Sequence, residues 1–384
     1  MIGQQIRIGL GTLAAVCWLA TSAHAIIISS SQNTATQGAG VTPAATWDGV
    51  GNIILNNVDL DGNTFETVDD QWGSGTLIRN GQGVAKYILT AAHVLFSDNA
   101  NTVRIPNANF RLNFPEPNNG INAIQYGVVR SAVHPSFNGN TLANDIAILE
   151  LGVDLGGTTT SYNINRPTLI ADERATMGSG LVGNKVGFGR SGDGVNGDTA
   201  NPVNTPNAGD PNAQQGTRRN GTNFVELFGP VVAGNNVRDA FNNLLTAPAN
   251  TLIYDFDNHV AGTNGPLDPA GNPALGAALS AQFTGPSTAV GTQEADTAPG
   301  DSGGPMFLFH TPTNQWLVVG VTSYGTDGGA NPPPPFGSRF GDIAVDTRVQ
   351  SFAGWITMQI PEPGSLILTF CGLGVIVCAR RMRL

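Results

Sequence analysis

Cysteine is missing from most of this chain. The three cysteines, Cys17, Cys371 and Cys378, all lie in apolar stretches near the two ends. The body between them therefore has no disulfide bond, no thiolate chemistry and no cysteine-based zinc site. Its stability has to come from the core alone or from a bound ion. Asp59–Asp61 and Asp255–Asn258 are acidic clusters that could bind Ca²⁺, although such clusters also occur as solvated turns.

Charged residues are also scarce, at 12% of the 384 residues, and the basic ones are in the minority. Lys and Arg number 18 against 28 Asp and Glu, which gives a net charge of −10. Because a nucleic acid needs a basic surface, this balance argues against nucleic acid as the main partner. With 40% hydrophobic residues, the chain can bury one sizeable core or two modest ones.

Long segments with a helical hydrophobic period are absent from the body, apart from two candidates at Val237–Leu245 and Val349–Met358. The 50 glycines favour turns and short strands. Apolar segments bounded by turn residues predict strands at Gly51–Leu55, Gly75–Ile78, Tyr87–Thr90, Asp145–Leu151, Lys185–Phe188 and Trp316–Thr322. This pattern favours an all-β sandwich or barrel. Ser191–Gly221, rich in Gly, Asn, Pro and Asp, predicts a long, exposed and mobile loop.

The first 25 residues have the order of parts of a secretory signal peptide. Arg7 supplies a positive charge, Ile8–Leu19 is an apolar run, and Ala23-His24-Ala25 has the small-x-small form of a cleavage site. A first buried helix is the alternative interpretation. We expect signal peptidase to be a partner and the mature chain to begin at Ile26.

The C-terminal end of the chain also has the features of a targeting signal. Pro361–Gly364 is followed by the apolar run Ser365–Ala379, and then by Arg380, Arg381 and Arg383. The run is shorter than the ~20 residues of a comfortable membrane span, and the basic cluster behind it fits a cytoplasmic stop. This order resembles the PEP-CTERM sorting signal of Gram-negative bacteria.

The resemblance implies export, retention in the inner membrane, processing by an exosortase-type enzyme and delivery to the cell surface or extracellular matrix. An ordinary tail anchor is the alternative, and it also places the body outside the cytoplasm. The sequence thus predicts a signal peptide at 1–25, one folded body at 26–360 and a sorting segment at 361–384, with a short membrane segment at 365–379.

Three short stretches of the body carry candidate catalytic residues. Gly300-Asp301-Ser302-Gly303-Gly304-Pro305 places a serine in a turn where glycines let backbone N–H groups approach a reacting carbonyl. Leu89–His93 ends an apolar strand in a histidine, and Asn144–Leu149 begins one just after an aspartate. Each alone is more often a plain turn, a buried histidine or a capping residue.

In the order His93, Asp145 and Ser302, these stretches resemble the trypsin/chymotrypsin family. Further stretches that resemble the family are Gly75–Ile78, His134–Asn138, Val186–Gly189, Ser323–Gly325 and Thr347–Ile356. The resemblance covers the body from Gly51 to Met358. It implies two six-stranded antiparallel β-barrels with a C-terminal helix and an active site between the barrels.

The mechanism implied by the resemblance is hydrolysis of a polypeptide substrate through an acyl-enzyme. His93 is the general base for Ser302, Asp145 orients the imidazole, and the N–H groups of Gly300 and Ser302 form the oxyanion hole. The alternatives are a catalytically inactive protease-like surface or matrix protein, and an esterase on another fold. The intact triad disfavours the first, and the lack of a Gly-x-Ser-x-Gly elbow disfavours the second.

The resemblance places Asp296, six residues before the serine, at the base of the primary specificity pocket beside Ser323 and Gly325. A carboxylate there selects Lys or Arg, whereas the alternative is a surface loop acid. The chain departs from the family at Ala298, where a disulfide cysteine is usual, and at Ala344 and Asp346, which replace Gly and Tyr.

The family usually buries a new N-terminal ammonium against the acid before the serine, here Asp301. Signal cleavage after Ala25 would create an isoleucine N-terminus at Ile26. We therefore expect signal peptidase itself to deliver the activating N-terminus.

Overall fold

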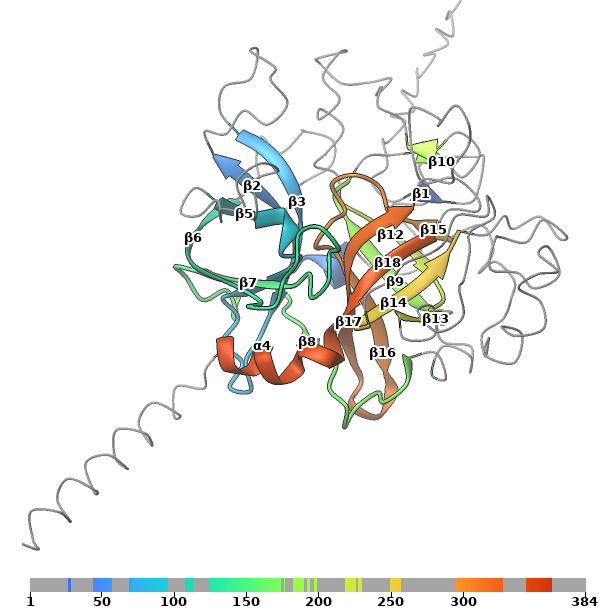
Figure 1. Ribbon diagram of the computed structural model, residues 1–384. Coiled ribbons are helices and arrows are strands. Elements are labelled where there is room, and N and C mark those ends of the chain that lie inside the picture. Colours follow the sequence, from blue (N-terminus) through green and yellow to red (C-terminus); the bar gives the residue numbers. More distant parts are fainter. Residues whose placement is uncertain are drawn as a thin grey trace, which may run out of the picture.

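The computed structural model describes residues 27–28, 44–56, 69–95, 108–112, 124–173, 176, 182–189, 192–193, 197–198, 218–225, 227–229, 249–256, 294–326 and 343–360. Within them strands dominate and helices are short (Figure 1). The signal segment, Ile26, the predicted helix Val237–Leu245 and the C-terminal segment 361–384 lie outside these residues. No helix in the described part is long and apolar enough to cross a membrane.

Six antiparallel strands close into a barrel in the first half of the chain, paired in the order β2-β3-β4-β7-β6-β5. Their bounds are β2 (Val50–Asn56), β3 (Asp69–Ile78), β4 (Tyr87–Thr90), β5 (Ala108–Leu112), β6 (Ile124–Val133) and β7 (Ala147–Leu151). Ile53, Ile88, Phe110 and Leu149 are fully buried. Four of the six strands, β2, β3, β4 and β7, correspond to predicted strands, whereas β5 and β6 were not predicted. Together the six strands enclose one apolar core, and burial of such a core is the main favourable term in folding.

The second half forms a curled sheet, paired in the order β12-β9-β16-β17-β18-β14-β13, with β8 parallel to β17. Its strands are β8 (Asn163–Ile164), β9 (Gly183–Gly187), β12 (Arg219–Asn223), β13 (Leu227–Phe228), β14 (Thr251–Asp255), β16 (Pro305–His310), β17 (Gln315–Thr326) and β18 (Ile343–Arg348). The predicted two-barrel, all-β fold is confirmed. The second unit is an eight-stranded sheet rather than the expected six strands, and it includes the short strands β8 and β13.

A small third sheet joins distant parts of the chain in the order β11-β10-β1-β15. Its strands have two residues each: β1 (Ile27–Ile28), β10 (Gly192–Asp193), β11 (Gly197–Asp198) and β15 (Ala295–Asp296). Ile27 lies opposite Asp296 in an antiparallel register. The start of the body is thus next to the segment that leads to Ser302.

The two units lie side by side and share one core (Figure 1). Trp47, in the 3₁₀ turn η1 (Ala44–Trp47), stacks on Phe307 of β16 with ring centroids 4.7 Å apart. Tyr162, in the segment between the units, lies 4.5 Å from the same ring. Such aromatic contacts stabilise beyond plain apolar burial. The interface between the two units is therefore well packed, which suits a site located between them.

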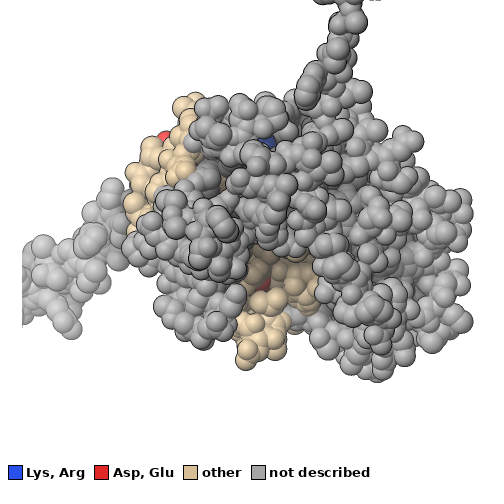
Figure 2. Space-filling model, turned by 90° about the horizontal axis from the view of Figure 1, so that it is seen from above, with Lys and Arg blue, Asp and Glu red and all other residues tan. Residues whose placement is uncertain are grey.

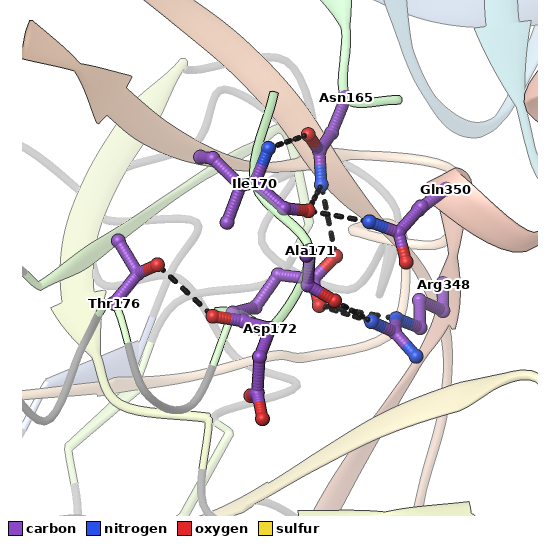
Figure 3. Close-up of polar contacts among 8 residues, drawn as sticks. Asn165, Ile170, Ala171, Asp172, Thr176, Arg348 and Gln350 are labelled. Carbon is purple, nitrogen blue, oxygen red and sulfur yellow. Dashed lines mark hydrogen bonds and ion pairs between the residues drawn. The ribbon is translucent and has the colours of Figure 1, made fainter. Parts of the chain in front are cut away.

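The connection between the units is also fixed by polar contacts (Figure 3). Arg348, at the end of β18, donates to the fully buried Glu173 carboxylate at 2.7 Å and to the Ala171 carbonyl at 3.0 Å. Asn165 bonds Ile170 through both its amide nitrogen and its amide oxygen. The connecting segment is thereby held against β18, close to the C-terminal helix.

All six predicted strands have an observed counterpart; Tyr87–Thr90 coincides with β4, and the other five are shifted at one end or both. The strand predicted from Asp145 begins only at Ala147, because Asn144 has a φ of 57° and the Ile146 N–H turns back to the Asn144 carbonyl. The predicted helix at Val349–Met358 is a 3₁₀ turn, η4 (Val349–Phe352), followed by α4 (Ala353–Gln359).

The prediction of one continuous loop at Ser191–Gly221 is wrong in part. This stretch contains β10, β11 and the first residues of β12. β10 pairs with β1, and β12 pairs with β9 over five residues. Gly- and Asn-rich segments have weak intrinsic strand preference, so their pairing depends on partners that local composition does not reveal.

Candidate active site

His93 begins the 3₁₀ turn η2 (His93–Leu95), three residues after the end of β4, and is held by Asp145 from the turn before β7. Its Nδ1 lies 2.7 Å from Asp145 Oδ2, and its backbone N–H donates to Asp145 Oδ1 at 2.9 Å. The carboxylate is completely buried, whereas a quarter of the imidazole is exposed. Both oxygens of Asp145 thus fix the histidine, while the ring keeps an open side for proton transfer.

Ser323 of β17 also donates to the buried Asp145 carboxylate. The β17–β18 register shifts between Thr322 and Tyr324, so Ser323 is the extra residue of a β-bulge. A bulge turns one side chain out of the regular alternation, and here that side chain points to Asp145. On the far side, Thr347 of β18 donates to the Asp145 carbonyl at 2.8 Å.

Tyr324, the next residue of β17, is affected by the same carboxylate. Burial raises the pKa of its phenol to about 12, and the negative charge of Asp145 adds to this rise. The phenol therefore stays neutral at physiological pH. Tyr324 is therefore a neutral neighbour of Asp145 and adds no second negative charge beside it.

The turn that carries Ser302 packs directly on the end of β4. A Cβ on Gly303 would lie 2.1 Å from Thr90 Oγ1 and 3.0 Å from the Ala91 nitrogen. Gly303 has a φ of +83° and donates its N–H to the Thr322 carbonyl of β17. Only glycine combines this conformation with so close an approach, which brings the turn of Ser302 next to the end of β4, three residues before His93.

The N–H groups of Gly300 and Ser302 have no acceptor among the hydrogen bonds between described residues. Around them the backbone is pinned: Ser74 N donates to the Ser302 carbonyl at 2.8 Å, and Ser74 Oγ donates to the Gly300 carbonyl at 2.9 Å. Ser74 Oγ also accepts the Phe188 N–H at 3.0 Å. Donors fixed in advance in this way are what an oxyanion hole requires.

Sequence reasoning missed Ser74. It lies on β3 directly before the Gly75–Ile78 stretch, and an isolated serine between two glycines gives no signal of a structural role. Its contacts to the serine turn exist only in the folded structure, where β3 lies next to that turn.

Asp301, the residue before Ser302, is buried and faces Gly187, the last residue of β9, and Gly189 just after it. Its Oδ1 accepts the Gly189 N–H at 2.8 Å, and its Oδ2 accepts the Ala298 N–H at 2.9 Å. A Cβ on Gly187 would lie 2.0 Å from Asp301 Oδ1, so no larger residue fits there. The carboxylate therefore anchors the serine turn to β9.

The structure puts Asp296 in β15 with 3% exposure, so it is not a surface loop acid. Gly325 lies exposed on β17, two residues after Ser323, and pairs with Ala344 of β18. Asp346, two residues further along β18, is fully buried. Seen from above, a group of described residues is visible below the centre of the picture, and one acidic side chain lies among them (Figure 2).

The calcium hypothesis concerns residues that are mostly outside the described part. Asp59–Asp61, Asp257 and Asn258 are among them, and only Phe256 of these clusters is described in full. Among the described residues, no group of three His, Cys, Asp or Glu side chains is arranged to hold a metal ion.

Two all-β units with an aspartate-oriented histidine and a glycine-flanked serine at their joint define the class of two-barrel serine hydrolases. The family comparison agrees with this class, since the chain matches the Trypsin family model over residues 66–227 and 277–356. This match covers more than half of the sequence. The chain belongs to the trypsin family of serine-type peptidases.

Proposed function

We propose that this chain is an active endopeptidase in which His93, Asp145 and Ser302 form the catalytic triad. The observation that carries the proposal is the pair of contacts from the buried Asp145 carboxylate to the backbone and ring of His93. This arrangement fixes the imidazole with Nδ1 toward Asp145 and leaves Nε2 for the serine. If Asp145 and His93 were only a structural ion pair, nothing would require the serine turn to present the N–H groups of Gly300 and Ser302.

The proposed reaction proceeds in two halves. His93 Nε2 takes the Ser302 proton as Oγ attacks the scissile carbonyl, and the N–H groups of Gly300 and Ser302 stabilise the oxyanion. The imidazolium then returns the proton to the leaving amine, which departs with the new N-terminus. Water, activated by the same imidazole, attacks the acyl-enzyme and releases the second product.

We propose that Asp296 selects Lys or Arg at the residue before the cleaved bond. Its burial supports this role, because a desolvated carboxylate binds a substrate cation more strongly than an exposed one. Ser323 and Gly325 lie on the strand that would run beside the substrate. The chain is proposed to act outside the cytoplasm of a Gram-negative bacterium, sorted by its two terminal segments.

The first test is labelling of the mature protein, residues 26–361, with a fluorophosphonate probe. We expect stoichiometric labelling of the wild type and none of Ser302→Ala, since the probe reacts only with an activated serine beside a formed oxyanion hole. Circular dichroism of both proteins checks that they are folded. A folded wild type that stays unlabelled would refute the proposal and favour a non-catalytic protease-like protein.

We further propose that the ammonium of Ile26 activates the site by pairing with Asp301. Two observations support this: the next residue, Ile27, lies opposite Asp296 in the small sheet, and Asp301 is buried with 1% exposure. A buried carboxylate gains most from a partner of opposite charge.

This activation model predicts that one extra residue before Ile26 lowers kcat/KM by about 100-fold, the scale of one lost oxyanion donor. The matched control carries the same extra residue at the C-terminal end, where it should have no effect. Mass spectrometry must verify each mature end before kinetics are measured. Equal activity of the extended and authentic proteins would exclude a role for the Ile26 ammonium.

A further inference from the structure

A buried cation lies beside the segment that carries Asp296. Lys185 of β9 is 1% exposed, and its Nζ contacts Asp346 Oδ1 at 2.7 Å, Asp346 Oδ2 at 2.6 Å and Thr322 Oγ1 at 2.7 Å. An ammonium has three N–H donors, so these contacts use all of them. None is left for another carboxylate while Asp346 is in place.

Tyr254 connects this pair to the specificity segment. Its phenol donates to Asp346 Oδ1 at 3.2 Å, and its ring centroid lies 5.1 Å from Lys185 Nζ. The Thr297 side chain, adjacent to Asp296 in the chain, hydrogen-bonds the same phenol. The Lys185–Asp346 pair is therefore connected through Tyr254 to the residue next to the candidate specificity residue Asp296.

Three carboxylates act on the Lys185 ammonium: Asp346 most strongly, then Asp301 and Asp296. Burial lowers the pKa of Lys185 and raises the pKa of Asp346, because leaving water penalises both charged forms. Their mutual attraction opposes both shifts, and three short contacts favour the ionised pair. The Lys185 ammonium and these three carboxylates form one charged cluster. The position of the ammonium therefore affects the electrostatic potential at all three carboxylates.

We propose that Asp346 is a specificity-determining residue, which binds the Lys185 ammonium and so prevents this charge from offsetting Asp296. The inference rests on the proposed role of Asp296 in Lys and Arg selection. Neutralising Asp346 alone removes one negative charge from the cluster. Removing Lys185 and Asp346 together leaves the net charge of the cluster unchanged.

The test compares two peptide substrates that differ only in Arg or Leu before the cleaved bond. We expect Asp346→Asn, which is nearly isosteric, to lower the Arg:Leu ratio of kcat/KM by about 30-fold, as expected for one unit charge several ångströms away in a partly desolvated site. The double variant Lys185→Met/Asp346→Leu should return the ratio to the wild-type value. It also replaces a buried ion pair by apolar side chains, which folded proteins often tolerate.

Glu173→Gln is the matched control. Glu173 is another fully buried carboxylate bonded to a basic side chain, Arg348 at the end of β18. Its neutralisation should lower stability but leave the Arg:Leu ratio unchanged. A fall of the ratio in this variant would show that any loss of a buried charge alters specificity, and would overturn the inference.

The remaining outcomes separate this inference from the proposed function. An unchanged ratio in Asp346→Asn, or an equal loss for the Arg and Leu peptides, overturns the role of Asp346. A wild type that is labelled by fluorophosphonate but does not prefer Arg overturns both this role and that of Asp296, while the peptidase activity stands. A wild type without labelling contradicts the peptidase activity itself.

Discussion

Asp145→Asn is expected to lower kcat by about 10⁴-fold at neutral pH, the scale of this substitution in serine triads. In the wild type, the carboxylate accepts hydrogen bonds from the His93 backbone N–H and from Ser323, and it contacts Nδ1 of the His93 ring. An amide NH₂ in its place would donate to Nδ1 and move the ring proton to Nε2. The imidazole could then no longer accept the Ser302 proton.

The control for this prediction is Ser323→Ala, which removes one donor to the same carboxylate but leaves the histidine tautomer intact. We expect this variant to lose about 10- to 100-fold in kcat, in line with about 1.5–3 kcal/mol for one lost hydrogen bond to a charged group. Steady-state kinetics on one peptide substrate measures both variants. A loss of less than tenfold in Asp145→Asn would mean that Asp145 only supports the fold.

Gly303→Ala is expected to destabilise the protein by about 4 kcal/mol or more, at the extreme of single substitutions. The new Cβ would lie 2.1 Å from Thr90 Oγ1 and 2.3 Å from the Ser74 carbonyl oxygen. These two atoms cannot easily retreat, because Thr90 Oγ1 donates to the Ser74 carbonyl inside the buried barrel wall. The serine turn would therefore have to leave β4, and labelling of Ser302 would be lost as well.

Gly83→Ala is the matched control for the steric effect. Gly83 has a φ of +85°, close to the +83° of Gly303, but its Cβ would meet nothing within 4 Å. We expect a cost of about 1 kcal/mol, from the left-handed backbone conformation alone. Urea unfolding midpoints compare the two variants. Equal costs would show that the close approach at Gly303 does not constrain the turn.

Much of the candidate site could be predicted from local sequence. His93, Asp145 and Ser302 each lie in a short stretch whose residue types follow from the chemistry, such as glycines around a nucleophile or an apolar strand before a histidine. Four strands of the first barrel, β2, β3, β4 and β7, were also predicted, since alternating or continuous apolar residues indicate burial directly, whereas β5 and β6 were not predicted. Their ends were less so, as the late start of β7 at Ala147 shows.

Contacts between distant segments could not be predicted in the same way. Lys185 and Asp346 are 161 positions apart, and each alone would be expected on the surface. Ser74 and Gly300 are 226 positions apart. Burial of such polar groups is acceptable only when a partner is present, and the pairing of strands supplies that partner.

The sequence by itself determined the order of the three candidate catalytic residues, the all-β class and the absence of disulfides from the body, because these depend on residue type and local pattern. Only the tertiary structure decided which groups support the site. Closure of the first barrel brought Ser74 under the serine turn, and the pairing of β9, β16, β17 and β18 in one curled sheet set Asp346 against Lys185. The physical reason is that strand pairing joins residues far apart in the chain, and a buried charge is stable only where such pairing supplies its counter-charge.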